Sequence, residues 1–267
     1  MKAPRFLSLF RVTLILLIPL SAFSQRKVVL NMPTYDNEVL HFGFALAVNQ
    51  LFVSIRPIEN LSNTVFQGDD QIPDINPMPD YVMVQAISCE PGYGFTVSIL
   101  GDLRVGDHFN FRFIPSFMYG SRQIKYTLAK YNMDPTEMKI KMTSETTLKD
   151  IPSTYINFPL EFKFKAKRYN NFRPYLMAGA LYSLDLSSNA KKRINKNPET
   201  HIVRFEQSDF YIQGGVGFDF YNEWFKFGVE LKMMYGLKEM LTHDGTLYTE
   251  SIDRINSKIF QLALTFE

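Results

Sequence analysis

Residues 156–165 read INFPLEFKFK, and this stretch contains the pattern that decides the fold. Large apolar side chains occupy its even-numbered positions, whereas Glu161, Lys163 and Lys165 occupy odd-numbered positions. A period of two is expected of a β-strand with one apolar face and one polar face. The stretch therefore predicts a strand that lies between two unlike environments.

The same alternation recurs seven more times along the chain. We expect strands of about 9 to 13 residues, which is the length that a tilted strand needs to cross a bilayer. No stretch after residue 25 has the roughly 20 consecutive apolar residues of a membrane-spanning helix. The eight predicted strands centre on residues 42–49, 93–99, 109–120, 156–165, 175–185, 210–219, 225–233 and 260–266.

The connections between these strands alternate between short and long. This asymmetry is typical of outer-membrane barrels, which have tight periplasmic turns and long extracellular loops. The pattern predicts an all-β fold, an eight-stranded antiparallel up-and-down transmembrane β-barrel over residues 41–267. The even strand number places the N- and C-termini in the periplasm. Short turns are predicted at 102–108, 167–171 and 221–224, and long loops at 54–91, 121–153, 187–208 and 237–256.

The sizes of the side chains predict which face points outward. Aromatic residues make up 15% of the chain, and most of the rings fall on the apolar face. The polar face carries many Gly, Ala, Ser and Asn residues, which suit the narrow lumen of an eight-stranded barrel. A soluble barrel with an apolar lumen is the alternative, but such a lumen has no room for so many rings. We therefore expect the apolar face to contact outer-membrane lipid.

The N-terminal residues 1–24 are predicted to form a signal peptide. Basic residues precede an apolar run over residues 12–20, and Ala22 and Ser24 suit cleavage before Gln25. A membrane anchor is the alternative, but the run is too short to span a bilayer. Residues 25–40 are expected to form a periplasmic N-terminal segment. Cleavage leaves 26 basic and 27 acidic residues, and this near-neutral charge argues against a nucleic-acid partner.

The polar faces of the predicted strands carry charges of both signs. An eight-stranded barrel has room for side chains but not for a water channel, so these charges should pair and close the lumen. A proton or ion path is the alternative, but buried charges without partners are costly. The predicted lumen charge network consists of Arg112, Glu161, Lys163, Asp185, Asp219, Glu230 and Lys232.

Pro115 and Pro159 interrupt the third and fourth predicted strands. Proline has no N–H group to donate to a neighbouring strand, so we expect a bulge or a gap in pairing there. In a simple hairpin register the two prolines lie nearly opposite each other. Bulges often mark functional edges, so a weakened seam for partner docking is the second interpretation.

The sequence shows no catalytic, cofactor or metal site. His41, His108, His201 and His243 lack nearby ligands at metal-binding spacing, and Cys89 is the only cysteine. No nucleophile elbow is present, and no Ser–His pair shares a strand face as a lipid-modifying barrel enzyme would need. We therefore expect a protein that is not an enzyme and that needs no cofactor.

Several segments resemble the PorT family, also called SprT, of outer-membrane barrels from the type IX secretion and gliding-motility system of Bacteroidota. The resemblance implies a non-enzymatic component that supports protein export across the outer membrane with other secretion-system proteins as partners. A generic small outer-membrane barrel for adhesion or envelope stability is the alternative. The similar segments are HFGFALAVNQ at His41, FNFRFIPSFMYGSRQIKY at Phe109, STYINFPLEFKFKA at Ser153, NNFRPYLMAGALYSLDL at Asn170 and SKIFQLALTFE at Ser257. The matched positions, which carry no assigned chemistry, are Arg112, Pro115, Gly120, Arg122, Pro159, Arg173, Pro174, Tyr175 and Gly179.

Overall fold

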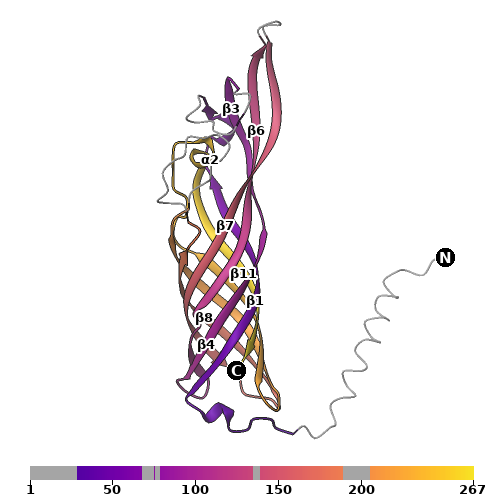
Figure 1. The fold of residues 1–267 in the computed structure, drawn as a ribbon, viewed down its shortest axis with the longest axis vertical. Coiled ribbons are helices and arrows are strands. Elements are labelled where there is room, and N and C mark those ends of the chain that lie inside the picture. Colours follow the sequence, from indigo (N-terminus) through magenta and orange to yellow (C-terminus); the bar gives the residue numbers. More distant parts are fainter. Residues whose placement is uncertain (1–28, 68–74, 76–78, 135–138, 189–204) are drawn as a thin grey trace, which may run out of the picture.

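A computed structural model describes residues 29–67, 75, 79–134, 139–188 and 205–267 (Figure 1). The predicted signal peptide at residues 1–24 lies outside the described residues. The described chain is all-β apart from short helical turns, and none of its helices is long and apolar enough to cross a membrane. The helical turns are η2 (Tyr35–Asn37), η3 (Leu61–Asn63) and α2 (Leu247–Glu250).

The described strands form one antiparallel sheet, as the period-two pattern predicted. Inward and outward side chains alternate along the strands because successive residues of a strand point to opposite faces. The eleven strands of the sheet are β1 (Leu40–Pro57), β2 (Val65–Phe66), β3 (Tyr81–Glu90), β4 (Gly92–Arg104), β5 (Phe109–Phe113), β6 (Ser116–Asp134), β7 (Lys139–Lys165), β8 (Phe172–Asp185), β9 (Ser208–Tyr221), β10 (Lys226–Gly236) and β11 (Ile252–Phe266).

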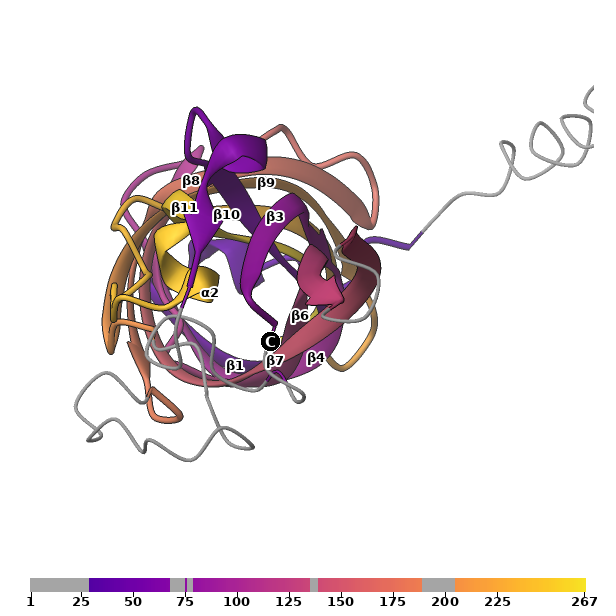
Figure 2. The same cartoon turned by 90° about the horizontal axis from the view of Figure 1, so that it is seen from above.

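The strands are arranged around a ring, which Figure 2 shows from above. Strand β1 pairs with β11 on one side and with β4 on the other, so that Phe44 lies between Phe266 and Ile99. From β11 the order continues through β10, β9, β8 and β7, and β7 pairs with both β5 and β6. Because β5 and β6 pair with β4, the sequence of hydrogen-bonded neighbours returns to β1.

The predicted number of eight strands is wrong, because the described sheet has eleven. The third predicted strand is divided at Ile114 and Pro115 into β5 and β6. Strands β2 and β3 lie within the segment 54–91, which was predicted as a loop. Strand β3 pairs with β6 and continues β4 beyond Pro91, so this segment extends the sheet.

The predicted loop at residues 121–153 is also mainly strand. Strands β6 and β7 stay in register from Ser121 opposite Pro152 to Asp134 opposite Lys139. They form the long hairpin at the top of Figure 1. We call this end of the ring the hairpin end. The opposite end, where the β4–β5, β7–β8 and β9–β10 connections lie with η2, is called the turn end.

The sheet has an apolar outer surface over most of its length towards the turn end. Phe162 is 61% exposed, whereas the neighbouring Lys163 is fully buried. The direction of the side chains therefore follows the prediction from residue size, with rings outside and charges inside. The exposed large side chains on the turn-end parts of β1, β4, β7, β9 and β11, which we call the apolar belt, include Phe42, Phe44, Phe95, Ile99, Phe162, Phe164, Phe210, Phe218, Leu262 and Leu264.

The interior at the hairpin end is a separate apolar core. It includes buried residues of β3, β6 and β11, together with α2, which packs inside the widened end of the ring. Ile124, Leu128 and Tyr126 from β6 belong to this core, and the Tyr126 hydroxyl donates a hydrogen bond to the Tyr248 carbonyl at 2.8 Å. This core explains why the segments predicted as loops are ordered as strands.

Candidate functional site

The centre of the lumen is occupied by the guanidinium group of Arg112. Strand β5 points this side chain inward, and it is completely buried. Arg112 Nη1 lies 2.7 Å from Glu230 Oε1 and 3.5 Å from Glu161 Oε2. Arg112 Nε lies 3.8 Å from Asp102 Oδ2. One cation on β5 therefore connects carboxylates from β4, β7 and β10.

Lys232 completes the cluster around the same two glutamates. Its Nζ atom lies 2.9 Å from Glu161 Oε1 and 2.8 Å from Glu230 Oε2. Gln213 Nε2 donates a further hydrogen bond to Glu161 Oε1 at 3.0 Å, and the Tyr175 hydroxyl donates one to Glu230 at 2.7 Å. Each buried carboxylate thus has more than one partner, which is the arrangement that offsets the cost of desolvating a charge.

A second ion pair lies beside this cluster. Lys163 Nζ is 2.8 Å from Asp219 Oδ2 and 3.7 Å from the centre of the Tyr175 ring. Because the same tyrosine bonds Glu230, it connects the two groups of charges. The structure therefore brings six of the seven predicted lumen charges together.

Asp185 is the predicted member that lies apart. It ends β8 towards the hairpin end, where its Oδ1 atom accepts hydrogen bonds from Ser187 and from the Thr154 amide. In the described part of the chain it forms no ion pair with the other six. Its side chain stabilises the end of the β7–β8 pairing instead, because the register places Asp185 opposite Tyr155, well away from the lumen centre.

The two prolines lie at the join between β5 and β6. The pairing with β7 puts Leu160 opposite Phe113 and Asn157 opposite Ser116, so that Ile114 and Pro115 fall in a gap between β5 and β6. The Pro115 carbonyl accepts a hydrogen bond from the Ile99 amide, and the Pro159 carbonyl accepts one from the Ile114 amide. On its other side β7 stays paired with β8 through Pro159.

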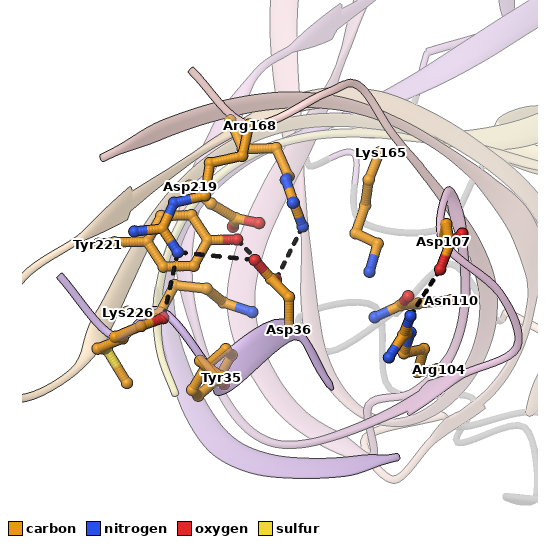
Figure 3. A network of polar contacts seen from close by, with 12 residues as sticks. Tyr35, Asp36, Arg104, Asp107, Asn110, Lys165, Arg168, Asp219, Tyr221 and Lys226 are labelled. Carbon is orange, nitrogen blue, oxygen red and sulfur yellow. Dashed lines mark hydrogen bonds and ion pairs between the residues drawn. The ribbon is translucent and has the colours of Figure 1, made fainter. Parts of the chain in front are cut away.

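A second polar network closes the turn end, as Figure 3 shows. Asp36, in η2, accepts hydrogen bonds from Arg173 at 2.8 Å and from the Tyr221 hydroxyl at 2.9 Å. Arg168 Nη1 lies 3.7 Å from the other oxygen of Asp36. Arg168 also lies over the Tyr221 ring at 3.6 Å. These contacts fix the segment before β1 across the opening of the ring.

Glu267 and Lys226 form the second part of the turn-end network. Lys226 Nζ lies 2.7 Å from Glu267 Oε2, and the Tyr35 hydroxyl donates to the same oxygen at 3.3 Å. Burial alone would raise the pKa of Glu267, but the Lys226 ammonium, with Lys163 and Arg112 behind it, lowers this pKa to about 2. Burial, and then the charge of Glu267, raises the pKa of Tyr35. The pair is therefore a permanent ion pair near neutral pH.

The turn-end network was not predicted. Asp36 lies in the segment that precedes the first strand, and Arg168 lies in a short turn. Neither residue belongs to an alternating pattern, so periodicity gives no information about its direction. The short turns were the sequence feature that could have predicted this network. A short turn keeps the charged residues beside it close to the opening of the ring.

Little free space is left in the lumen. A cavity of about 30 Å³ lies between the ion cluster and the hairpin-end core, lined by residues such as Ser98, Asn157 and Gln261. A water molecule needs about 10–15 Å³ of such volume, so the cavity holds about two waters. No group of three His, Cys, Asp or Glu side chains among the described residues is placed to hold a metal ion.

The sequence over residues 23–242 matches the family described as outer membrane protein beta-barrel domain. The chain belongs to this family. The barrel is therefore an outer-membrane protein, and its apolar belt contacts membrane lipid. The match is to outer membrane barrels in general and does not support the PorT/SprT family in particular.

Two solved structures are similar to this chain at low sequence identity. Neisserial surface protein A has a TM-score of 0.39 and 10% identity, with 85% of this chain and 98% of that chain covered. The outer membrane protease OmpT from Escherichia coli has a TM-score of 0.30 and 9% identity, with 90% of this chain and 97% of that chain covered. No curated protein matches the chain in sequence.

Proposed function

We propose that the protein is a non-enzymatic and non-conducting outer-membrane barrel that presents a folded structure on the cell surface. Its strands close into a barrel, in which β5 and β6 lie one after the other between β4 and β7 and β3 extends β4. The observation that carries this proposal is the buried ion cluster of Arg112, Glu161, Glu230 and Lys232, which fills the lumen. Side chains that fill the interior of a narrow barrel leave no continuous water path.

The turn end faces the periplasm in this proposal, with both termini of the mature chain there. Short connections are typical of the periplasmic side of outer-membrane barrels, and long extensions are typical of the extracellular side. Asn31 and Glu267 both make their contacts at the turn end. The β6–β7 hairpin and the apolar core beside it then project from the cell surface.

The specific role that we propose is support of protein export in a type IX secretion and gliding-motility system. The support for this role is the sequence resemblance to PorT/SprT proteins, together with a closed lumen that favours a scaffold over a channel. The hairpin of β6 and β7 offers a surface to other secretion proteins. A generic barrel for adhesion or envelope stability is the alternative.

Conductance in a planar lipid bilayer tests the closed lumen. The inserted barrel should give no ion-conducting steps under conditions in which a porin control conducts. Steady single-channel steps from the purified barrel would contradict the proposal, because they require a water path past the ion cluster.

Deletion of the gene tests the secretion role. The deletion strain should retain exported cargo in the periplasm and lose gliding, and the full-length chain should restore both. A chain in which residues 132–141, the tip of the hairpin beyond the β3 pairing, are replaced by a two-residue turn should insert normally but fail to restore export. Normal export and gliding in the deletion strain would favour the generic barrel.

A further inference from the structure

The Lys165 side chain lies on the inner face at the turn end of the lumen and has no carboxylate partner among the described residues. It is the last residue of β7, and its side chain is on the inward face because Phe164 and Ala166 point outward. Lys165 is only 4% exposed. Figure 3 shows its ammonium group between Asp36 and Asn110, with no hydrogen bond or ion pair to either. In the described part of the chain its Nζ atom has no acceptor within hydrogen-bond distance.

Every other cation of the lumen and turn-end networks has a carboxylate partner. The nearest carboxylate oxygen to each of them lies between 2.7 and 3.7 Å away. The partnered cations are Arg112, Lys163, Arg168, Arg173, Lys226 and Lys232. Lys165 is thus an exception within a set that otherwise follows the rule for buried charges.

The carboxylates near Lys165 already bind other side chains. Asp36 is held by Arg173 and Arg168, and Asp102 accepts a hydrogen bond from Asn110 and faces Arg112. If Lys165 shared Asp36 with Arg173 and Arg168, three cations would still surround one carboxylate.

Arg173 supplies a second unused donor on the same face. Lys165 pairs in register with Tyr175, and Arg173 is two residues before Tyr175 on β8, so the two cations are diagonal neighbours within reach of each other. Arg173 is 9% exposed, and its Nε atom is buried without a hydrogen-bond partner in the described part of the chain. Two neighbouring cations repel each other, and the single charge of Asp36, which already pairs with Arg173 and Arg168, does not balance both of them.

We propose that the turn end of the lumen holds one small oxyanion, of the phosphate or carboxylate type, between Lys165 and Arg173. Such an anion accepts hydrogen bonds from both groups through different oxygens, as lysine and arginine commonly provide for phosphate and carboxylate. The side chains face the lumen and not the apolar belt, so the anion enters from solvent at the turn end and not from a lipid headgroup. The site does not depend on the proposed secretion role.

Isothermal titration of the purified barrel in non-ionic detergent with inorganic phosphate, at constant ionic strength, tests this site. The unmodified barrel should bind phosphate at one saturable site. Lys165→Met should weaken binding at least tenfold, whereas Lys165→Arg should retain it. The matched control is Lys167→Met, because Lys167 is an exposed lysine two residues away on the same connection and should leave binding unchanged. A parallel titration with acetate distinguishes a general oxyanion site from one that needs phosphate.

Thermal unfolding of the same variants gives a second readout and verifies folding. Phosphate should raise the unfolding temperature of the unmodified barrel but not that of Lys165→Met, because a ligand stabilises only the state that binds it. Absence of saturable binding to the unmodified barrel would overturn the proposal. Equal weakening by Lys167→Met would also overturn it, because general attraction to positive charge would then explain the binding.

Discussion

The two ends of this barrel have opposite interiors. Near the turn end the inside is ionic and the outside is apolar, whereas at the hairpin end the inside is apolar and the outward face of β6 is polar. Strand β6 passes through both regions. Phe117 and Tyr119 point outward at one end, and Ile124 and Leu128 point inward at the other. The apolar face of a strand is therefore the one that points away from water, and it can change from the outer to the inner face of the sheet along one strand.

The apolar side chains of β6 change from the outer face to the inner face of the sheet near Arg122. This buried guanidinium donates hydrogen bonds to the Ser257 and Tyr155 hydroxyls, both at 2.8 Å. Beyond it, the outward positions of β6 are Gln123, Lys125 and Thr127. The hydrophobic effect favours the removal of apolar surface from water. A strand that extends from lipid into water is therefore expected to have its apolar side chains on the inner face in the part that water surrounds. We infer that the membrane ends at this level.

The largest predicted effect tests the ionic interior. Glu230→Ala removes the carboxylate shared by Arg112 and Lys232 and leaves buried positive charge without enough partners. We expect a loss of about 3–5 kcal/mol in the free energy of unfolding, measured by guanidinium titration in phospholipid vesicles. Asp253→Ala, which breaks the exposed pair with Arg56, should cost less than about 1 kcal/mol. Equal losses in the two variants would contradict the account of the lumen.

The second prediction tests the apolar interior at the hairpin end. Leu128→Ala removes a fully buried side chain from that core and should cost about 2–5 kcal/mol. Leu148→Ala lies on the same hairpin but removes an exposed side chain, so its effect should stay within about 0.5 kcal/mol. Protection of the β6 amides against hydrogen exchange measures this end separately from the rest of the barrel. Similar protection in both variants would show that the hairpin has no core of its own.

The third prediction tests where along the barrel the membrane ends. Phe162 and Leu148 both point outward from β7, but only Phe162 lies in the apolar belt. Phe162→Lys should destabilise the vesicle-inserted barrel by about 2–4 kcal/mol, because it puts a charge among lipid chains. Leu148→Lys should have almost no effect because it remains in water. A large cost for Leu148→Lys would move the membrane boundary towards the tip of the hairpin.

The smallest predicted effect concerns pH at the turn end. The pKa of Glu267 is about 2 in the folded barrel and near 4.5 when unfolded, so its ion pair stabilises the fold above pH 4.5. Acidification lets the unfolded chain bind a proton first, and stability falls as the pH drops from 4.5 towards 2. At pH 3.5 the free energy of unfolding should be about 1 kcal/mol lower than at neutral pH. Glu267→Gln should lack this part of the pH dependence in the same unfolding assay.

The alternating strands were predictable because each keeps one apolar face over its length in lipid. INFPLEFKFK at 156–165 shows this directly, and its positions lie within β7. The extensions at 121–134 and 139–153 were predicted as loops, because the regular pattern breaks there and charged residues become frequent. In β6 the alternation continues with the opposite face buried, at Ile124, Tyr126 and Leu128, whereas residues 140–146 of β7 are exposed on both faces. Recognition of the reversal in β6 requires knowledge of where the membrane ends.

The members of the lumen network were largely predictable, but their partners were not. Alternation within a strand shows that Arg112, Glu161 and Lys232 point to the same side, and six of the seven predicted charges do come together. Asp185 has the same inward direction but lies at a different level along the axis. The level of a residue depends on the stagger between strands, which the pattern within one strand does not contain.

The sequence by itself determined the all-β class, the inward or outward direction of each side chain in the belt, and the supply of charges for the lumen. It did so because a strand side chain has only two directions and the two environments differ sharply in polarity. The tertiary structure alone decided which cation meets which carboxylate, how the segment before β1 closes the turn end, and that Lys165 is left without a partner. These features depend on distances between strands far apart in the chain, and only the register of the ring sets those distances.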